Sequence, residues 1–254
     1  MTTSTKTKMV LIMEYDGTHY YGFQLQANLP TIQGEIETAL WKLTGERSRV
    51  MAASRTDSGV HAKGQVASFR TKSSLPSPTF VKGLNYYLPN DIAVKDAFKV
   101  SDSFNVRRQA ISREYNYYIL NSPTRLPIRR GFAYLVTRPL DIGAMNEACE
   151  VLIGEHDFAS FVTSLEGSNV KSMVRRIYRA RVEKDGDLVI FNIVASSFLP
   201  HQVRNTVGTL IKVGLGKMTI DEFRSILEVR RPGLAGPTVP AHGLCLMEVN
   251  YPHS

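Results

Sequence analysis

Two kinds of hydrophobic pattern alternate irregularly along this chain. In some segments the apolar residues recur at every second position, and in others they recur every three or four positions. The first spacing is typical of a strand with one buried face, and the second is typical of an amphipathic helix. Neither half of the chain keeps the regular strand–helix–strand rhythm of a parallel α/β fold. The pattern therefore predicts an α+β protein whose antiparallel or mixed sheets are covered by helices.

The first half of the chain predicts two helices among extended segments. Thr31 can cap a helix that ends near Gly45, and Ser77 can cap a second helix that has Pro78 in its first turn. Extended segments are predicted over residues 8–15, 47–53, 64–71 and, as one strand or a pair, 92–100.

The second half repeats this mixture. One helix is predicted to begin at Asp141 and to stop at Gly154, and a longer helix is predicted from about Pro200 to Val213. Residues 219–222 form a capping box that opens a further short helix. Strands are predicted over residues 111–119, 173–182, 188–195 and 243–251.

Length and composition restrict the class of protein. With 254 residues the chain can form one large domain or two ordinary ones, and a boundary near residues 102–108 predicts domains 1–103 and 104–254. No apolar run approaches the ~20 residues of a membrane span, and the N-terminal residues lack the apolar core of a secretory signal. Cys149 and Cys245 are too few and too far apart for a disulfide framework or a zinc site. We therefore expect a reduced, cytoplasmic protein.

The chain carries a surplus of positive charge. Lys and Arg outnumber Asp and Glu by 31 to 23, which gives a net charge of +8. Such a surplus suits a polyanionic partner, because the neutralisation of phosphates releases counterions. Many soluble proteins are equally basic, so charge alone is only a hint of nucleic-acid binding.

The first candidate for chemistry is the segment Arg55-Thr56-Asp57-Ser58-Gly59-Val60-His61. It brings a carboxylate, two hydroxyls, a guanidinium and an imidazole into one short loop between two predicted strands. Reactive groups often lie on loops held by a rigid scaffold. Asp-Ser-Gly is also a common turn sequence, in which Asp bonds its own backbone and Gly permits positive φ. The residues alone leave both interpretations open.

A second candidate comprises residues 104–108 and 113–118, where arginines are interleaved with aromatic residues. Cations can hold phosphates while a base stacks on a ring, which contributes about 1–3 kcal/mol per base. The alternative is a strand with exposed arginines and core tyrosines.

A third candidate is residues 198–205. In a helix, His201 and Arg204 lie on one face because they are three positions apart. A cation near a helix start is unfavourable, and a nearby carboxylate would resolve this. The alternative is a solvated arginine. No Cys, His and carboxylate spacing in the chain supports a metal site.

With these residues in view, the sequence resembles the TruA family, the tRNA pseudouridine synthases that act at positions 38 to 40 of the anticodon stem-loop. The resemblance runs from Tyr15-Asp16-Gly17-Thr18 to Tyr251-Pro252 and includes residues 55–62. Further matches are residues 22–24, 31–33, 64–66, 84–85, 88–89, 113, 115, 117, 154–158, 160–161, 203–205, 207–208 and 243–244.

The sequence departs from the family pattern at a few positions, none of which removes the carboxylate. The family usually has Gly at position 54, Ala at 58, Trp at 23, an aromatic residue at 245 and Ala at 106. This chain has Ser54, Ser58, Phe23, Cys245 and Val106 there.

The resemblance implies an isomerase that breaks the C1′–N1 bond of uridine and reattaches the uracil through C5, after the base has left the stack. It implies that Asp57 is the nucleophile and that Tyr115 stacks on the uracil. It also implies that Arg204 pairs with Asp57 and that Arg55 displaces the target base. The remaining implied contacts with the substrate RNA are Leu244, Phe104, Asn105, Val106, Arg107, Arg108, Lys171 and Arg175.

The resemblance further implies two RRM-like α/β-sandwich halves with mostly antiparallel sheets and an active-site cleft between them. It implies a homodimer that binds the anticodon stem-loop of tRNA and needs no cofactor and no metal. The alternatives are a pseudouridine synthase with other RNA targets and a non-catalytic RNA-binding relative. The latter should lack Asp57, Tyr115 or Arg204, and all three are present. A nuclease or nucleosidase would need a second acid–base pair or metal ligands, which the sequence does not reveal.

Overall fold

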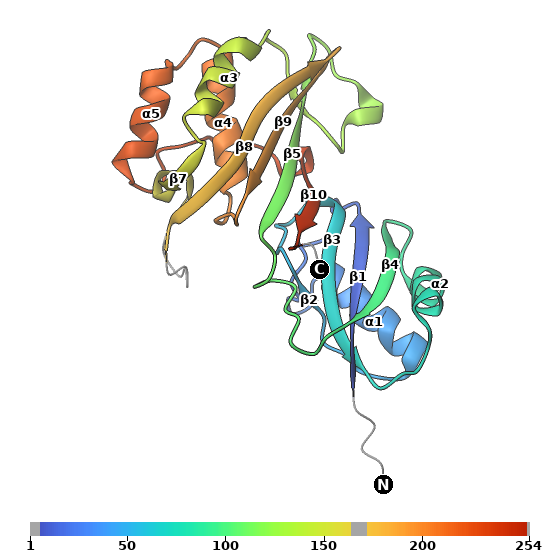
Figure 1. Ribbon diagram of the computed structural model, residues 1–254. Coiled ribbons are helices and arrows are strands. Elements are labelled where there is room, and N and C mark those ends of the chain that lie inside the picture. The colour runs from blue at the N-terminus through green and yellow to red at the C-terminus, as the bar shows by residue number, and fades with distance from the viewer. Residues whose placement is uncertain (1–5, 164–171, 253–254) are drawn as a thin grey trace. The chain divides into compact units, whose positions relative to one another are not determined.

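The chain forms two compact units (Figure 1). The structure is a computed structural model that describes residues 6–163 and 172–252. Unit 1 is Met1–Ile111 with Leu246–Ser254, and unit 2 is Ser112–Cys245. The sequence-based domains, 1–103 and 104–254, assign residues 104–111 and the C-terminal segment differently. No helix in the described part of the chain is long and apolar enough to cross a membrane.

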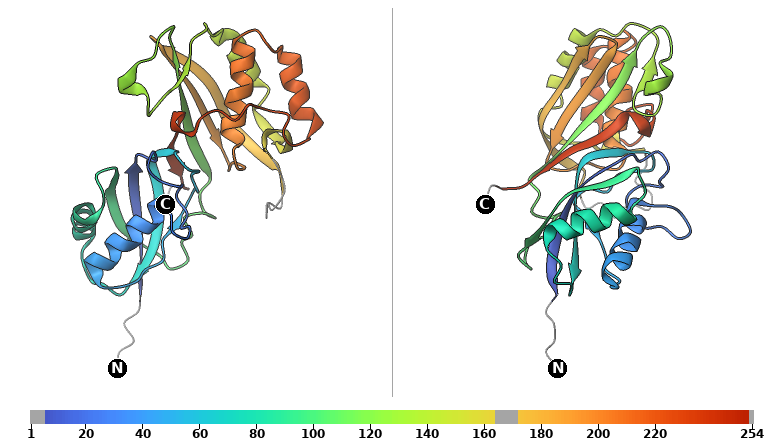
Figure 2. Two further views of the ribbon diagram at one scale, coloured as in Figure 1. Left: turned by 180° about the vertical axis from the view of Figure 1, so that it is seen from behind. Right: turned by 90° about the vertical axis from the view of Figure 1, so that its right-hand side faces the viewer.

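Unit 1 consists of a sheet with two helices on one face (Figures 1 and 2). In the sheet, β1 lies between β3 and β4 and is antiparallel to both. The short β2 pairs with β3, and β10 enters the unit from Leu246 onward. The elements are β1 (Thr7–Tyr15), α1 (Ile32–Thr44), β2 (Met51–Ala52), β3 (His61–Thr71), α2 (Ser77–Tyr87), β4 (Ile92–Val100) and β10 (Leu244–Asn250).

The two helices of unit 1 begin differently. The prediction for α1 is confirmed, since Gly34 N donates to Thr31 Oγ1 at 3.2 Å and Gly45 ends the helix with φ 72°. The prediction that Ser77 caps α2 is wrong. Ser77 is the first helical residue, and Pro76 occupies the cap position without a side-chain hydrogen bond. The local sequence therefore predicts that a helix forms here, but not the residue at which it begins.

The strands of unit 2 carry three helices on one face (Figure 2). The order β5-β9-β8-β7 is antiparallel throughout, and the short β6 is parallel to β5. The elements are β5 (Ser112–Asn121), β6 (Tyr134–Val136), α3 (Ile142–Glu150), β7 (Gly154–Asp157), β8 (Val174–Asp185), β9 (Leu188–Ala195), α4 (Gln202–Gly214) and α5 (Ile220–Val229), with 3-10 turns at Pro127–Arg129, Ala159–Phe161 and Ala241–Gly243. The predicted α+β class with mostly antiparallel strands is confirmed.

Two predicted helix ends in unit 2 need correction. α3 ends at Glu150 with Val151 as its C-cap, and Gly154, which has φ 109°, begins β7 instead of ending the helix. α4 begins at Gln202 rather than near Pro200, because His201 has the left-handed φ of 59° at the cap position. His201 therefore precedes the helix and does not share its face with Arg204.

Candidate functional site

The loop that carries Asp57 is a tight turn between β2 and β3. Val60 N donates to Asp57 O at 3.2 Å, and Gly59 adopts φ 75°. The turn interpretation of Asp-Ser-Gly is therefore correct for the backbone. It does not exclude chemistry, because the turn leaves the Asp57 side chain partly exposed.

A buried glutamine holds the start of this loop. Gln65, on β3, is 0% exposed, and its Nε2 donates to Ser54 O at 2.7 Å and to the Tyr15 hydroxyl at 3.1 Å. Its Oε1 accepts from Ser54 N at 3.3 Å. The Tyr15 hydroxyl lies 2.8 Å from Thr56 Oγ1. Since buried polar groups are costly to leave unpaired, this network fixes residues 54–56.

The segment before α1 holds the other side of the loop. Phe23 N donates to Thr56 O at 3.0 Å, and Gly59 N donates to Tyr20 O at 3.2 Å. Ser58, one of the departures from the family pattern, donates its hydroxyl to the same Tyr20 carbonyl at 3.2 Å. The turn around Asp57 is thus bonded on both sides.

His61 anchors the neighbouring turn and is buried. Its Nδ1 accepts from Gly17 N at 3.0 Å and lies 3.0 Å from Asp16 Oδ1. Burial opposes ionisation of Asp16, but hydrogen bonds from Thr18 and the charges of His61 and His19 lower its pKa overall. Among the described residues, no group of three or more His, Cys, Asp and Glu side chains is placed to hold a metal.

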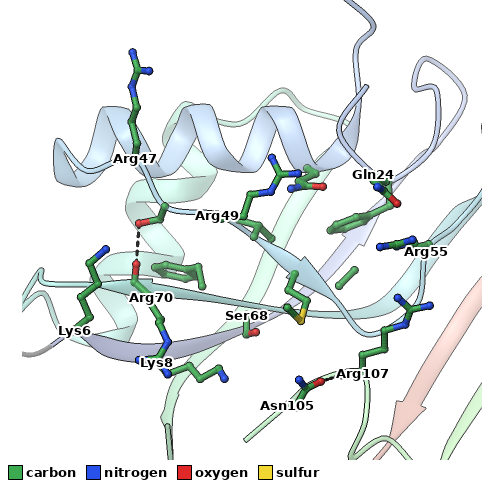
Figure 3. Close-up of a pocket in the computed structure, with 17 residues that line it drawn as sticks. Lys6, Lys8, Gln24, Arg47, Arg49, Arg55, Ser68, Arg70, Asn105 and Arg107 are labelled. Atoms are coloured by element: carbon green, nitrogen blue, oxygen red, sulfur yellow. Dashed lines mark hydrogen bonds between the residues drawn. The ribbon is translucent and has the colours of Figure 1, made fainter. Parts of the chain in front are cut away.

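Arg55 and the segment 104–108 also lie in unit 1. Arg55 and Arg107 are exposed, and their guanidinium groups lie near each other (Figure 3). Partial burial, together with the charge of Arg107, lowers the pKa of Arg55. Cations crowded in this way favour an anionic ligand.

The segment 104–108 is anchored by its apolar members. Val106 is fully buried, and its carbonyl accepts from the Tyr251 hydroxyl at 2.6 Å. The Phe104 ring packs on Tyr251 with centroids 5.3 Å apart. Asn105 Oδ1 accepts from the backbone N–H groups of Arg107 and Arg108, both at 3.0 Å. The two exposed arginines are therefore presented by an ordered turn.

In unit 2, Tyr115 lies on β5 and is 5% exposed. Its ring packs against that of Phe198 in a T-shaped contact, with ring centroids 5.2 Å apart and an interplanar angle of 89°. Arg204 lies in the first turn of α4, and its Nε donates to Val239 O at 2.7 Å. A backbone acceptor thus orients Arg204, which argues against a purely solvated side chain.

Sequence reasoning missed the role of Tyr117, which lies on the same face of β5 as Tyr115. Its hydroxyl donates to Pro240 O at 2.7 Å, and a Cβ at Gly243 would lie 2.6 Å from its ring. The pKa of Tyr117 is raised overall, because the effect of burial outweighs the opposite effect of the charge of Arg204. Tyr117 and Arg204 together hold the segment that leads to the buried Leu244. The alternation along β5 and the family match at residue 117 were the sequence signals, and neither indicated this hydrogen bond.

Arg175 and Lys171 are the last two implied contacts with the substrate RNA. Arg175, on β8, donates from Nη1 to Ser172 O at 2.8 Å and to Val174 O at 2.6 Å. Burial lowers its pKa. Lys171 lies outside the described residues.

The predicted site residues are therefore divided between the two units. Those of unit 1 are Arg55, Asp57 and residues 104–108, and those of unit 2 are Tyr115, Arg175, Arg204 and Leu244.

Comparisons with known proteins give a consistent result. A family described as tRNA pseudouridine synthase matches residues 11–107 and 148–252. A protein named tRNA pseudouridine synthase A from an Exiguobacterium species is 46% identical over 96% of this chain and 98% of its own length. Proteins of the same name from Acetivibrio thermocellus and Clostridium kluyveri are each 44% identical over 95% of this chain and 98% of their own length. A solved structure described as a Cbf5-Nop10-Gar1 complex covers 94% of this chain and 48% of that chain, with a TM-score of 0.37 and 14% identity, which is too distant to bear on function.

Proposed function

Because this chain belongs to the tRNA pseudouridine synthase family, we propose that it isomerises uridine to pseudouridine at positions 38, 39 and 40 in the anticodon stem-loop of tRNAs. Family membership over nearly the whole chain carries the proposal. The rigid turn that presents Asp57 supports it, because catalysis needs a reactive group held in one geometry.

In the proposed reaction, the Asp57 carboxylate acts on the sugar or the base as the C1′–N1 bond breaks. A carboxylate can trap or stabilise an electrophilic sugar carbon. The uracil turns and rejoins C1′ through C5, C5 loses its proton, and N1 ends with one, so no other reactant is required. Attack at C1′, attack on the base and a glycal route would all use this carboxylate.

The other proposed roles follow from the resemblance and suit the local geometry. Tyr115 stacks on the uracil, and its edge contact with Phe198 limits the orientation of its ring. Arg204 pairs with Asp57 and favours its ionised form. Arg55 displaces the target base from the stem. The proposal requires these residues of both units to act on one uridine.

The remaining contacts are proposed for RNA binding. Arg107 and Arg108 contact phosphates, with Phe104, Asn105 and Val106 ordering their segment, while Leu244 lines the uracil pocket. Lys171 and Arg175 are further proposed contacts with tRNA.

We also propose that the chain acts as a homodimer in the cytoplasm, as the family resemblance implies. One protomer has a mass of 28.4 kDa, so a light-scattering mass of twice this value is the expected result. A monomeric mass at micromolar concentration would contradict the homodimer.

The function is tested with an anticodon stem-loop transcript that carries uridine at positions 38 to 40. Asp57→Ala should abolish pseudouridine formation, measured by chemical mapping, while RNA binding stays close to that of the unchanged protein. Asp187→Ala removes an exposed carboxylate of unit 2 and is the matched control. Product from the Asp57→Ala variant would refute the assigned nucleophile.

A pseudouridine synthase with other RNA targets is the alternative of the same chemistry. Mapping pseudouridine in total RNA from cells that lack the gene separates the two, since the proposal expects losses at tRNA positions 38 to 40. A non-catalytic RNA-binding relative would bind the transcript and give no product.

A further inference from the structure

Unit 1 contains a strongly basic hollow of about 560 Å³, bordered by β1, β2, β3 and the segment 105–107 (Figure 3). Seven of the residues that line it are basic, and no Asp or Glu is among the described residues that line it. The seven are Lys6, Lys8, Arg47, Arg49, Arg55, Arg70 and Arg107. We call this feature the basic hollow.

Carboxylates near the basic hollow neutralise it only in part. Arg49 lies 3.6 Å from Glu37, and Arg70 lies 3.0 Å from Asp102. The Arg70 and Asp102 side chains are 47% and 59% exposed, and the Arg49 side chain is 65% exposed. An exposed ion pair such as Arg70–Asp102 contributes about 0–1 kcal/mol, so an arriving anion can replace this carboxylate. The Glu37 side chain is only 21% exposed and also accepts from Gln33 Nε2 and Val50 N, so it stays in place beside Arg49.

The arginines of β8 in unit 2 show a different arrangement. Arg176, Arg179 and Arg181 each lie within 4 Å of a glutamate, at 3.9, 3.0 and 3.0 Å. That row of arginines is matched by carboxylates along the same sheet. The basic hollow instead concentrates positive charge, and the charge of Arg107 helps to lower the pKa of Arg55 at its edge.

The uncharged lining indicates which part of a nucleic acid fits. Gln24, Ser68 and Asn105 offer neutral hydrogen-bonding groups beside the cations. The two aromatic rings of the lining, Phe23 and Phe69, are 1% and 2% exposed. Neither ring can stack on a base, whereas guanidinium groups bind phosphate well. The lining therefore suits a sugar-phosphate backbone rather than a base.

We propose that the basic hollow binds the backbone of the substrate tRNA through roughly two or three of its phosphates. The identity of the RNA rests on the proposed function. Arg55 lies two residues before Asp57 and lines the hollow, so the same RNA strand that presents its uridine to Asp57 can continue over it. Lys6, Lys8, Arg47, Arg49 and Arg70 thereby become RNA contacts that no sequence motif indicated.

The test removes positive charge from residues of the basic hollow that have no proposed catalytic role. The variant Arg47→Gln/Arg49→Gln/Arg70→Gln leaves Arg55 and Arg107 in place. Arg47→Lys/Arg49→Lys/Arg70→Lys keeps the charge. Lys42→Gln/Lys82→Gln/Lys99→Gln removes three exposed charges of unit 1 that do not line the hollow. The Kd for full-length tRNA is measured by fluorescence anisotropy over about 50–200 mM salt.

The glutamine variant at the hollow should give a plot of log Kd against log salt that is shallower by about 2–3, and a Kd about tenfold or more weaker at physiological salt. Its KM for tRNA should rise while kcat at saturating tRNA stays unchanged. The lysine variant and the control variant should keep the original slope. If the triple variant does not fold, each single Arg→Gln change should lower the slope by about one.

An unchanged slope in the folded glutamine variant would overturn the proposal, as would an equal loss in the control variant. Binding of tRNA and formation of pseudouridine are measured in separate assays. Absence of pseudouridine at positions 38 to 40 with the unchanged protein would refute the proposed function, whereas the binding slopes would still decide whether the basic hollow holds RNA.

Discussion

Gly22 and Gln65 show how single residues shape the turn around Asp57. Gly22 has φ 86°, and a Cβ there would lie 2.7 Å from Thr56 O. Gln65 is fully buried and bonds both backbone groups of Ser54. One residue permits a close approach by lacking a side chain, and the other supplies buried hydrogen bonds. Neither carries chemistry itself, so both are positioning residues.

Gly22→Ala should therefore impair catalysis without removing a reactive group. Its positive φ costs about 1–2 kcal/mol, and Thr56 must also shift. Since a displacement of about 1 Å can cost about 100-fold in rate, we expect single-turnover pseudouridine formation to fall about 10- to 100-fold. Tight RNA binding should remain.

Gly45→Ala is the matched control for this change. Gly45 has φ 72°, and nothing lies within 4 Å of its Cβ position. It should lose a similar 1–2 kcal/mol of unfolding free energy in urea but keep full activity. Equal activity in the two variants would show that contact with Thr56 does not position the turn.

At the scale of helices and strands, local signals predicted correctly those helix beginnings that depend on a side-chain cap. Thr31, Asp141 and Thr219 cap their helices as expected, because a cap needs only a side chain and a backbone three residues away. Gly154 was misread as a helix stop because its partner, Ile177 on β8, is distant in sequence. Likewise His201, at the start of α4, contacts Thr163, 38 residues earlier.

The capping box of α5 makes stability depend on pH. Thr219 N and Oγ1 both donate to Glu222 Oε2, and these bonds lower the pKa of Glu222 below its ordinary 4.5. A lowered pKa stabilises the fold above the unfolded value and loses that effect as pH falls through the folded value. The stability advantage over Glu222→Gln should thus be full above pH 4.5 and shrink below it.

The difference in stability is measured by thermal unfolding of the unchanged protein and of the Glu222→Gln variant between acidic and neutral pH. Glu228→Gln, which removes an exposed carboxylate from the same helix, is the control. A difference between the Glu222→Gln variant and the unchanged protein that stays constant across the acidic range would contradict the role of the hydrogen bonds.

The hydrogen bonds around the candidate site could not be predicted where they join residues distant in sequence. Arg55, Asp57 and Arg107 belong to short motifs that can be recognised directly. The bond from Tyr117 to Pro240 spans 123 positions, and that from Arg204 to Val239 spans 35. The basic hollow gathers side chains from Lys6 to Arg107. Such groupings depend on the order of strands, which no local pattern specifies.

At the scale of the whole molecule, the last strand ties the C-terminal segment to unit 1. Asn250 O accepts from Ile111 N at 2.8 Å, and Val249 is 6% exposed. A side chain at Gly64, on β3, would collide with Met247 O. The core of unit 1 is therefore completed by residues remote in sequence from the rest of it.

Val249→Ala should destabilise unit 1 selectively. Loss of two buried methyl groups and the resulting cavity should lower the free energy of unfolding by about 1.5–3 kcal/mol. Hydrogen exchange should speed up for amides of β1 and β3 and change little for those of β9. Val229→Ala, at a residue that is 56% exposed on α5, should have little effect. Faster exchange confined to unit 2 would contradict the assignment of this strand.

The return of the C-terminal segment also has a consequence for synthesis on the ribosome. All of unit 2 lies between Ser112 and Cys245, so its residues emerge before those of the last strand of unit 1. Chains generally fold domain by domain from the N-terminus. Here unit 1 cannot complete its fold until residues 246–250 leave the exit tunnel. Unit 2, although it is synthesised later than most of unit 1, can therefore finish folding first.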